Sequence, residues 1–264
     1  MNFFVYKGTG GLFHNLFGLS QAIDLSIKYN ITLIIDINAH KVFGGDLNDF
    51  FRLRKKFKYK YNYENIPLLN DIKLKSLRKC GYNGNNKNYD INLNNKINIL
   101  YGYSQNFKIL KYITVTDDLF NKIKLNNKII KEKYISVHFR NSDKKNDKIK
   151  FIKKIRETFN KYNEIKTLYI ASDDYNFYEI IEEEFSNCNI IRKTFFEKGL
   201  VNLHYGIDDK KKQQYDCLVD IYYILLSDIF IPSMNSEMSK GINYIIKNKC
   251  NFFPNIISKA VINF

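Results

Sequence analysis

The sequence predicts an α/β protein with two doubly wound halves. From Lys133 onward, short apolar runs that suit buried strands alternate regularly with segments of helical periodicity. Near the N-terminus, a strand-like run, a glycine-rich turn, an amphipathic segment and a second strand-like run follow one another. No stretch of 18 uninterrupted apolar residues is present, so a membrane span is not expected. This alternating order is typical of parallel sheets flanked by helices.

The N-terminal half begins with a predicted strand over residues 3–6, a helix over 12–29 and a strand over 31–37. Apolar residues at helical spacing indicate the helix, and the β-branched run ITLIIDI indicates the second strand. The turn between them, KGTGG, lets backbone amides approach a ligand at the helix start. Its spacing is not the dinucleotide fingerprint GxGxxG, so a plain tight turn explains it as well as a binding loop does.

Residues 41–98 are less regular. They contain the basic run Arg52–Lys60, one proline, and an Asn/Gly/Lys-rich tract over 80–96 for which a loop or insertion is predicted. The basic run is expected to be a solvated face of a loop or helix. Beyond this region we predict a strand over 98–103 and a helix over 117–131.

The C-terminal half is predicted to alternate between strands and helices. The predicted strands span residues 134–139, 167–171, 189–192 and 228–232, and the predicted helices span 149–162, 175–185, 213–227 and 237–247. This order is that of a doubly wound sheet. We place the domain boundary near residue 125, so the expected domains are 1–125 and 126–264.

The charge of the chain is strongly basic, with 42 lysines and arginines against 27 aspartates and glutamates and a formal net charge of +15. Such a balance favours anionic partners, among them a phosphorylated substrate or a nucleic acid. The sequence has no pattern of an RNA-recognition strand, a zinc finger or a basic zipper, so nucleic acid is not the expected partner. A basic protein that binds polyanions without catalysis is the non-enzymatic alternative.

The four cysteines, Cys80, Cys188, Cys217 and Cys250, are far apart in the sequence. Without a CxxC pair, neither a zinc ribbon nor a redox pair is indicated, and no metal site is predicted. The spacing suits mostly buried thiols in a reducing compartment. The N-terminal apolar run is too short for a signal peptide, so we expect a cytoplasmic protein.

Polar clusters follow three of the predicted C-terminal strands. They are His138/Arg140/Asp143, Ser172/Asp173/Asp174 and Ser233/Asn235/Ser236/Glu237. Ligands of a doubly wound sheet lie outside the carboxyl ends of its strands, so three such clusters predict a nucleotide pocket. Arginine suits a diphosphate because its planar fork stays charged and can bond two oxygens together.

Each cluster also has a purely structural interpretation. Arg140 and Asp143 could form an ordinary surface pair, and Asp173 or Asp174 could cap the next helix. Asp220 stands on an otherwise apolar helical stretch, where it either faces the pocket or is solvated on the outer face. Three polar strand ends together are less easily explained by chance than any one of them alone.

These motifs resemble those of the α1,6-fucosyltransferase and protein O-fucosyltransferase superfamily, whose GT-B fold has two Rossmann-like halves. VHFRNSDK (137–144) is similar to that family's VHVRRTDK signature, with Asn141 in place of the second arginine. LYIASDD (168–174) looks like the second motif. In the third motif, a helix aspartate lies sixteen residues before a serine, as Asp220 and Ser236 do here. GGLFHNLFGLSQAIDLSIKYNITLIID (10–36) is similar to the loop, helix and strand of the acceptor-side half.

The resemblance implies a GT-B enzyme with its donor site in the C-terminal half. It implies that Arg140 binds the β-phosphate of GDP-fucose and stabilises the leaving diphosphate, and that Ser236 lies near a phosphate. The other implied substrate-binding residues are Gly10, Gly11, His14, Asn15, His138, Asp143, Lys144, Asp173, Asp174, Asp220 and Glu237. The resemblance also implies that Asp173, with Asp174, contacts the guanine end of the nucleotide. The reaction is expected to invert the anomeric centre and to need no metal and no cofactor beyond the donor substrate, GDP-fucose.

The catalytic base is not carried over directly. The family has a glutamate a few residues past the Asp-Lys pair, whereas this chain has Lys148 there, with Asp147 beside it. Asp147 is therefore our candidate base. An α1,2-type fucosyltransferase, which has a related His-x-Arg-x-x-Asp motif, and a transferase of another GDP-sugar are the enzymatic alternatives. The motifs do not select among acceptor glycans or oligomeric states.

Overall fold

The computed structural model of the chain describes residues 2–8, 11–36, 47–54, 57–61, 77–80, 93–94, 97–101, 107–141, 146–194 and 209–263. The chain forms two compact units, Met1–Thr114 and Val115–Phe264, each with its own parallel sheet. The boundary that we placed near residue 125 falls inside the second unit, at the end of helix α4 (Asp117–Asn126).

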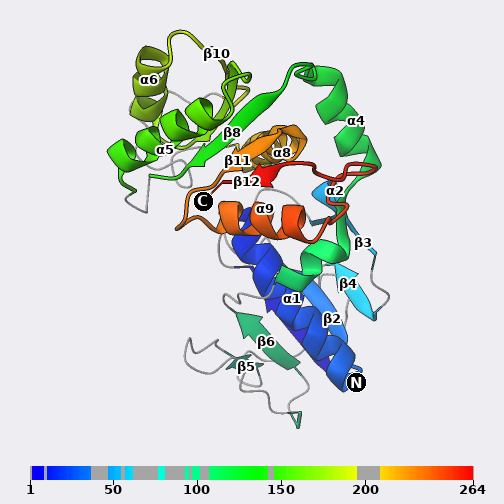
Figure 1. The fold of residues 1–264 in the computed structure, drawn as a ribbon. Coiled ribbons are helices and arrows are strands. Elements are labelled where there is room, and N and C mark those ends of the chain that lie inside the picture. The colour runs from blue at the N-terminus through cyan, green and yellow to red at the C-terminus, as the bar shows by residue number, and fades with distance from the viewer. Residues whose placement is uncertain are drawn as a thin grey trace. The chain divides into compact units, whose positions relative to one another are not determined.

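The sheet of the first unit has the order β4-β2-β1-β6-β5, and its paired strands are parallel (Figure 1). Its strands are β1 (Phe3–Lys7), β2 (Thr32–Asp36), β4 (Tyr59–Tyr61), β5 (Leu77–Cys80) and β6 (Ile97–Tyr101). The apolar runs of β1 and β2 occupy the centre, where both faces of a parallel sheet are buried. The predicted strands at 3–6, 31–37 and 98–103 are thus present as β1, β2 and β6, although residues 37, 102 and 103 lie outside the described residues.

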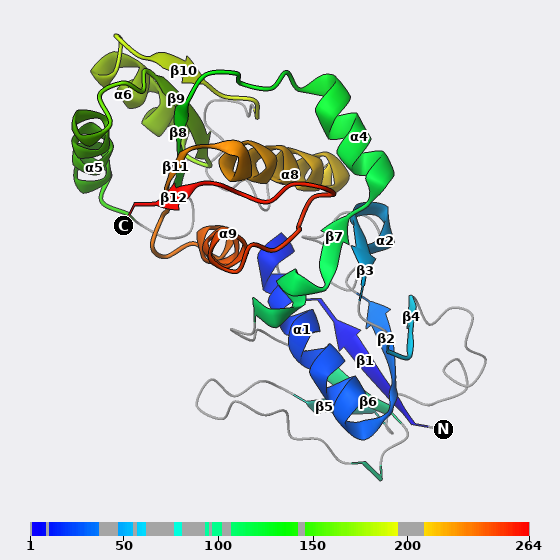
Figure 2. The ribbon, with the colours of Figure 1, turned by 45° about the vertical axis from the view of Figure 1, so that its right-hand side comes forward.

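Helix α1 (Leu12–Tyr29) connects β1 to β2 along one face of this sheet (Figure 2). Its apolar face is buried, as the helical spacing predicts. The helix ends at Asn30, which takes the left-handed conformation with φ of 51° that asparagine tolerates better than most residues. This βαβ unit places the start of α1 at the carboxyl end of β1.

The region 41–98 holds more regular structure than we predicted. Its additional elements are α2 (Leu47–Phe50), β3 (Phe51–Leu53), β4 and β5. The basic run Arg52–Lys60 is therefore divided between two short strands, although its cations Arg52, Arg54, Lys58 and Lys60 are exposed. Strands of three or four residues with alternating charges carry too little apolar signal to be recognised. The 3-10 helix η2 (Phe107–Lys111) and strand β7 (Ile113–Val115), which pairs with β3, follow them.

The sheet of the second unit has the order β10-β9-β8-β11-β12, again with parallel pairing. Its strands are β8 (Tyr134–Phe139), β9 (Thr167–Ser172), β10 (Asn189–Ile191), β11 (Ile229–Ile231) and β12 (Val261–Ile262). Its helices after α4 are α5 (Lys148–Lys161), α6 (Tyr175–Glu184), α8 (Lys210–Leu226) and α9 (Glu237–Lys247). The chain runs outward from β8 to β10 and then returns to β11 on the other side of β8. The topological switch point therefore lies between β8 and β11.

The side chains of β8 alternate between the two faces of this sheet. Val137 and Phe139 belong to the core under α5 and α6, where Phe139 stacks on Phe177 with 4.1 Å between ring centroids. Tyr134 points to the opposite face, and its hydroxyl donates to the carbonyl of Tyr223 on α8 over 2.5 Å. His138 shares this second face, so the alternation directs its imidazole toward α8 and α9.

The predicted α/β fold class with two doubly wound halves is confirmed, and further local differences concern α4 and β12. The helix predicted over 117–131 ends at Asn126, because Asn127 leaves the helical conformation and its side chain donates to the carbonyl of Ile123 over 2.9 Å. Asparagine competes for backbone groups in this way at helix ends. The sequence did not predict β12, which has only two residues and depends on pairing with β11.

Candidate functional site

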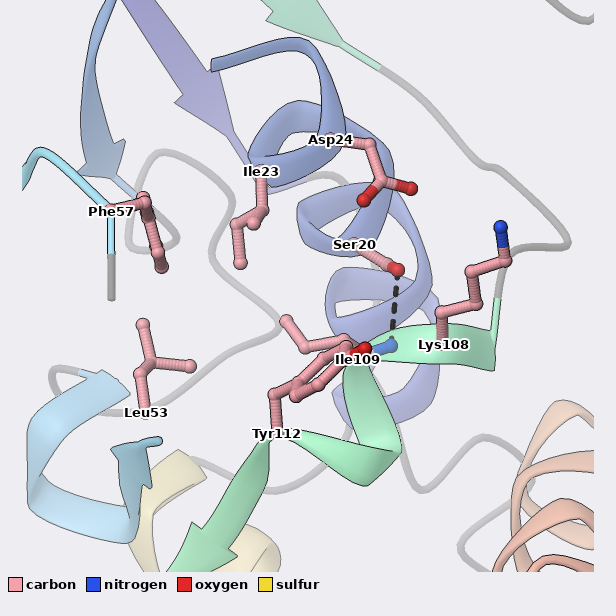
Figure 3. A pocket seen from close by; sticks show the side chains of 8 residues that line it. All are labelled: Ser20, Ile23, Asp24, Leu53, Phe57, Lys108, Ile109 and Tyr112. Carbon is pink, nitrogen blue, oxygen red and sulfur yellow. Dashed lines mark hydrogen bonds between the residues drawn. The ribbon is translucent and has the colours of Figure 1, made fainter. Parts of the chain in front are cut away.

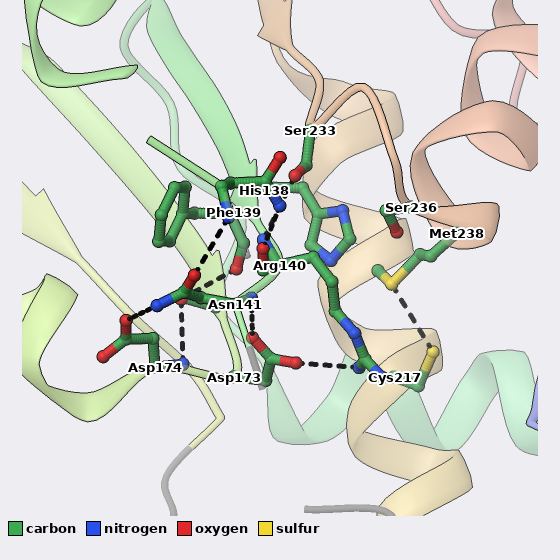
Figure 4. Close-up of polar contacts among 12 residues, drawn as sticks. His138, Phe139, Arg140, Asn141, Asp173, Asp174, Cys217, Ser233, Ser236 and Met238 are labelled. Carbon is green, nitrogen blue, oxygen red and sulfur yellow. Dashed lines mark hydrogen bonds and ion pairs between the residues drawn. The ribbon is translucent and has the colours of Figure 1, made fainter. Parts of the chain in front are cut away.

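The carboxyl ends of β8 and β11 bring together residues that are about a hundred positions apart in the sequence (Figure 4). The Nδ1 atom of His138 lies 2.7 Å from the hydroxyl of Ser239, which also accepts a hydrogen bond of 3.0 Å from the backbone N–H of Ser233. The backbone N–H of Arg140 donates to the Ser233 hydroxyl over 3.3 Å. These contacts join the two strand ends at the switch point.

Arg140 forms an ion pair with Asp173, which follows the neighbouring strand β9. The distance from Arg140 Nη1 to Asp173 Oδ2 is 2.8 Å, and the two side chains are 15% and 7% exposed. A largely desolvated pair of this kind keeps its guanidinium in one orientation. Because a guanidinium has five N–H donors, one carboxylate does not use its full donor set.

Asn141 and Lys148 hold the two aspartates that follow β9. The backbone N–H of Asn141 donates to Asp173 and its amide donates to Asp174, each over 2.7 Å. The Lys148 ammonium lies 2.8 Å from Asp174 Oδ2. Asp174 also caps α6 by accepting from the backbone N–H of Phe177, so the helix-cap interpretation holds for this residue.

His138 is neutral at physiological pH. Burial lowers the pKa of its imidazole to about 4; the nearby carboxylate of Asp173 opposes this shift and the guanidinium of Arg140 adds to it. A neutral ring beside Ser239 acts as a hydrogen-bonding support and not as a positive charge.

Asp220 is half-buried, and its side chain points toward the sheet. Its carboxylate accepts from the hydroxyl of Tyr169 on β9 over 2.7 Å and from the hydroxyl of Thr194 over 3.1 Å. Burial raises the pKa of Asp220 to about 7, which these two hydrogen bonds oppose and Asp216 reinforces. The outer-face interpretation of Asp220 is therefore wrong.

Cys217 lies one helical turn before Asp220 on α8. Its thiol interacts electrostatically with both the Asp220 carboxylate and the Arg140 guanidinium. Burial raises the pKa of the Cys217 thiol to about 12; Asp220 adds to the shift and Arg140 opposes it. Both charged groups are therefore within electrostatic reach of the same sulfur atom. Figure 4 shows Cys217 beside the guanidinium, with its sulfur 3.8 Å from that of Met238.

Ser236 and Glu237 begin helix α9 at the same edge of the sheet. Ser236 is the N-cap, and its buried hydroxyl accepts from the backbone N–H of Ser239 over 3.3 Å. Glu237 forms an ion pair of 2.9 Å with Lys240 on the first turn. The positive end of the helix dipole makes this end favourable for an anion.

Asp147, our candidate base, is exposed and caps α5. Its carboxylate accepts from the backbone N–H of Lys150 over 3.0 Å. Three other predicted site residues, Gly10, Asp143 and Lys144, lie outside the described residues.

The predicted residues of the first unit gather around the start of α1. Gly11 is its N-cap, His14 is half-buried, and Asn15 is buried with its carbonyl accepting from the Tyr6 hydroxyl over 2.9 Å. Figure 3 shows a pocket in this unit further along α1, lined by Ser20, Ile23, Asp24, Leu53, Phe57, Lys108, Ile109 and Tyr112. None of the predicted residues lines this pocket.

Several residues at the site were not predicted from the sequence. Ser239 is the central one, since its hydroxyl contacts both His138 and the backbone of Ser233. Its position three residues after the helix cap Ser236 was the available signal, because the N3 position of a helix faces back toward the cap. Tyr169 and Thr194, the partners of Asp220, gave no recognisable signal.

Across the residues that the structure describes, no three His, Cys, Asp or Glu side chains converge as metal ligands would. Within the same part of the chain, no helix is both long enough and apolar enough to cross a bilayer. Cys188, Cys217 and Cys250, the cysteines whose side chains the structure describes, form no disulfide.

Two doubly wound units of this kind define a GT-B-like fold. One solved structure that shares it is the NodZ α-1,6-fucosyltransferase soaked with GDP-fucose, with a TM-score of 0.60, 10% identity and 91% of each chain covered. A second is NodZ from Bradyrhizobium, with a TM-score of 0.60, 10% identity and 92% of each chain covered. POFUT1 in complex with GDP-fucose is also similar, with a TM-score of 0.64, 8% identity, and 99% of this chain and 97% of that chain covered. The resemblance to GT-B fucosyltransferases is confirmed at the level of the fold. No protein-family model and no curated protein matches the sequence.

Proposed function

We propose that this protein is an inverting glycosyltransferase that transfers fucose from GDP-fucose to a hydroxyl of a glycan. The observation that carries the proposal is the oriented guanidinium of Arg140, paired with Asp173 over 2.8 Å at the switch point between β8 and β11. The same fold occurs in NodZ soaked with GDP-fucose and in POFUT1 in complex with GDP-fucose.

In this proposal, Arg140 binds the β-phosphate and stabilises the diphosphate as the glycosidic bond breaks. Preorganised charge at a leaving group accelerates such a step because it needs no reorganisation when the charge develops. The amides at the start of α9 and the Ser236 hydroxyl assist at the same phosphate. These groups supply the positive potential that a divalent cation would otherwise supply, so we propose that transfer is metal-independent.

We assign the recognition of guanine to Asp220, with the earlier prediction for Asp173 and Asp174 retained as a second contact. Guanine presents two N–H donor groups on one edge, and an ionised carboxylate can accept both. Asp220 on α8 and Arg140 after β8 both interact electrostatically with Cys217, so we place both in one nucleotide site. Uracil and adenine lack this pair of donors.

The acceptor hydroxyl must attack the sugar from the side opposite the diphosphate for the configuration to invert. We propose that the first unit, through Gly10, Gly11 and His14, holds the acceptor, and that the buried Asn15 supports the start of α1. Asp147 would take the proton of the attacking hydroxyl. The GDP and the fucosylated glycan then leave as the two products.

The proposal is tested by the thermal unfolding of the purified protein with GDP, UDP, GDP-fucose or GDP-mannose, with and without EDTA. Ligand at 100 times its Kd stabilises the folded state by about 2.7 kcal/mol, so guanine nucleotides should raise Tm by several degrees. We expect no effect of UDP and no influence of EDTA. The absence of a shift with every nucleotide would contradict the proposal, and EDTA sensitivity would contradict metal independence.

Transfer itself is measured as GDP release and as the linkage of the product. A new α1,6 linkage is expected with a suitable glycan, whereas an α1,2 linkage would assign the chain to the alternative transferase class. Faster turnover with GDP-mannose than with GDP-fucose would identify a different donor.

Replacing Asp147 separates its role as a helix cap from its proposed role as a base. Asparagine caps helices about as well as aspartate, so Asp147→Asn should preserve Tm. Loss of a general base should lower kcat by roughly 10²- to 10⁴-fold while GDP affinity is unchanged. Asp147→Ala is the matched variant that loses both roles. If Asp147→Asn transfers fucose at the wild-type rate, another group is the base.

A further inference from the structure

Asn141 occupies the position between the two ion pairs of the site. It follows Arg140 directly and uses three of its polar groups at once. The backbone N–H donates to Asp173 Oδ1 over 2.7 Å, the amide Nδ2 donates to Asp174 Oδ2 over 2.7 Å, and the amide oxygen accepts from the backbone N–H of Asn146 over 3.1 Å (Figure 4). The side chain of Asn146 returns to the carbonyl of Arg140.

Each oxygen of Asp173 therefore has a defined partner. Oδ1 accepts from Asn141 and Oδ2 faces Arg140 Nη1 over 2.8 Å. A carboxylate held through one oxygen can orient a guanidinium through the other, since both bonds are charge-assisted and directional. This bond to Oδ1 comes from the backbone of Asn141, whereas the Asn141 side chain contacts Asp174 and Asn146.

Asp174 is held in the same way by groups from three elements. Its Oδ2 atom accepts from the Asn141 amide and lies 2.8 Å from Lys148 Nζ, and its Oδ1 atom accepts from the backbone N–H of Phe177 over 3.3 Å. The side chains of Lys148 and Asp174 are 27% and 11% exposed. Two adjacent carboxylates are thereby balanced by one cation each, Arg140 and Lys148.

We propose that Asn141 is a positioning residue of the donor site. Its side chain holds Asp174, with Lys148 as the counter-charge, and it holds Asn146, which bonds the carbonyl of Arg140. These contacts fix the backbone after β8, so that its N–H keeps Asp173 in place to orient the Arg140 guanidinium. This inference rests on the proposed function of Arg140. An amide is the side chain that fits, because it donates to one carboxylate and accepts from a backbone N–H at the same time. Neither a hydrocarbon nor a carboxylate at this position can do both at neutral pH.

Replacing Asn141 with aspartate gives a variant whose hydrogen bond to Asp174 should depend on pH. The new carboxyl group would face two acidic groups and three basic or neutral ones, namely Asp173, Asp174, Arg140, Lys148 and His138. When ionised, it repels Asp174 and cannot donate to it. When protonated, its O–H replaces the lost donor. The defect should therefore be strong at pH 8 and weaker at pH 5.5.

The experiment compares wild type, Asn141→Ala, Asn141→Asp and, as a control, Ala at the exposed Asn163. GDP affinity and the kinetics of fucose transfer are measured between pH 5.5 and 8.5. Loss of a hydrogen bond to a charged group should weaken GDP binding of Asn141→Ala by about 10- to 100-fold and lower kcat, with the KM for the acceptor unchanged. Asn141→Asp should regain GDP affinity, relative to wild type, as the pH falls.

The outcomes separate this inference from the proposed function. If wild type binds GDP and transfers fucose, and Asn141→Ala does both equally well, the positioning role is overturned while the proposed function stands. If Asn141→Ala does not fold, the pH dependence of GDP binding by Asn141→Asp tests the positioning role instead. A loss of GDP affinity in Asn141→Asp that is the same at every pH overturns that role. Failure of wild type to bind any guanine nucleotide overturns both.

Discussion

Replacement of Arg140 by alanine is expected to abolish GDP-dependent stabilisation and fucose transfer. The guanidinium is 15% exposed and paired with Asp173 over 2.8 Å, so it is already oriented before the donor binds. Removing one partner of a desolvated charge contact typically costs 2–5 kcal/mol, which corresponds to a loss of GDP affinity of roughly 30-fold or more. Loss of leaving-group stabilisation should lower kcat by a further ~10²- to 10³-fold. Calorimetric titration with GDP and a GDP-release assay measure the two effects.

Two controls distinguish this effect from a folding defect. Arg140→Ala leaves the Asp173 carboxylate without its cation in a buried position, which destabilises the protein by itself. The double variant Arg140→Ala/Asp173→Asn removes both charges and should recover much of the lost Tm while still failing to bind GDP. Arg140→Lys keeps the charge but loses the planar fork, so intermediate binding is expected. Full GDP binding by the double variant would show that Arg140 is not a donor ligand.

Replacement of Asp220 by asparagine is expected to remove a loss of stability at rising pH and to weaken guanine binding. The pKa of this carboxyl is raised from its ordinary value of 3.8 to about 7 by burial, so between these values the folded state holds a proton that the unfolded state has released. Stability therefore falls as the pH rises from about 4 to about 7, by at most about 1.4 kcal/mol per pH unit. Asp220→Asn has no proton to lose, so its stability should not show this fall.

Guanine binding should follow the opposite pH dependence in the wild type. The ionised carboxylate is the form that accepts from two N–H donors, so GDP affinity should increase up to tenfold per pH unit below pH 7 and level off above it. Asp220→Asn should bind GDP roughly 100-fold more weakly at pH 8, because it loses charge-assisted hydrogen bonds, and should no longer prefer GDP to ADP. Denaturant unfolding and GDP titration at several pH values test both statements. Tight, selective GDP binding by Asp220→Asn would contradict the assignment.

The second unit was predictable element by element because its signals are local. The run YISVHF predicted β8 with the bounds that the structure has, and α9 likewise begins at Glu237 and ends at Lys247. Both combine a clear period with a polar boundary, which is the information that sequence patterns carry best. By contrast, β3, β4 and β5 have three or four residues each, and each contains at least one lysine or arginine. They are strands because neighbouring strands supply their hydrogen bonds, which no local pattern records.

The sequence by itself determined which polar residues lie at the strand ends, since Arg140 and Asp173 directly follow β8 and β9, and Ser236 lies five residues after the end of β11. Parallel pairing then required these ends to share one edge. Only the tertiary structure decided which side chains meet there. Asp220 could equally have faced the solvent, but α8 turns it toward Tyr169 of β9. Ser239 reaches His138 only because β11 pairs beside β8. Such contacts depend on the order of strands in the sheet, which is a property of the packed chain and not of any segment within it.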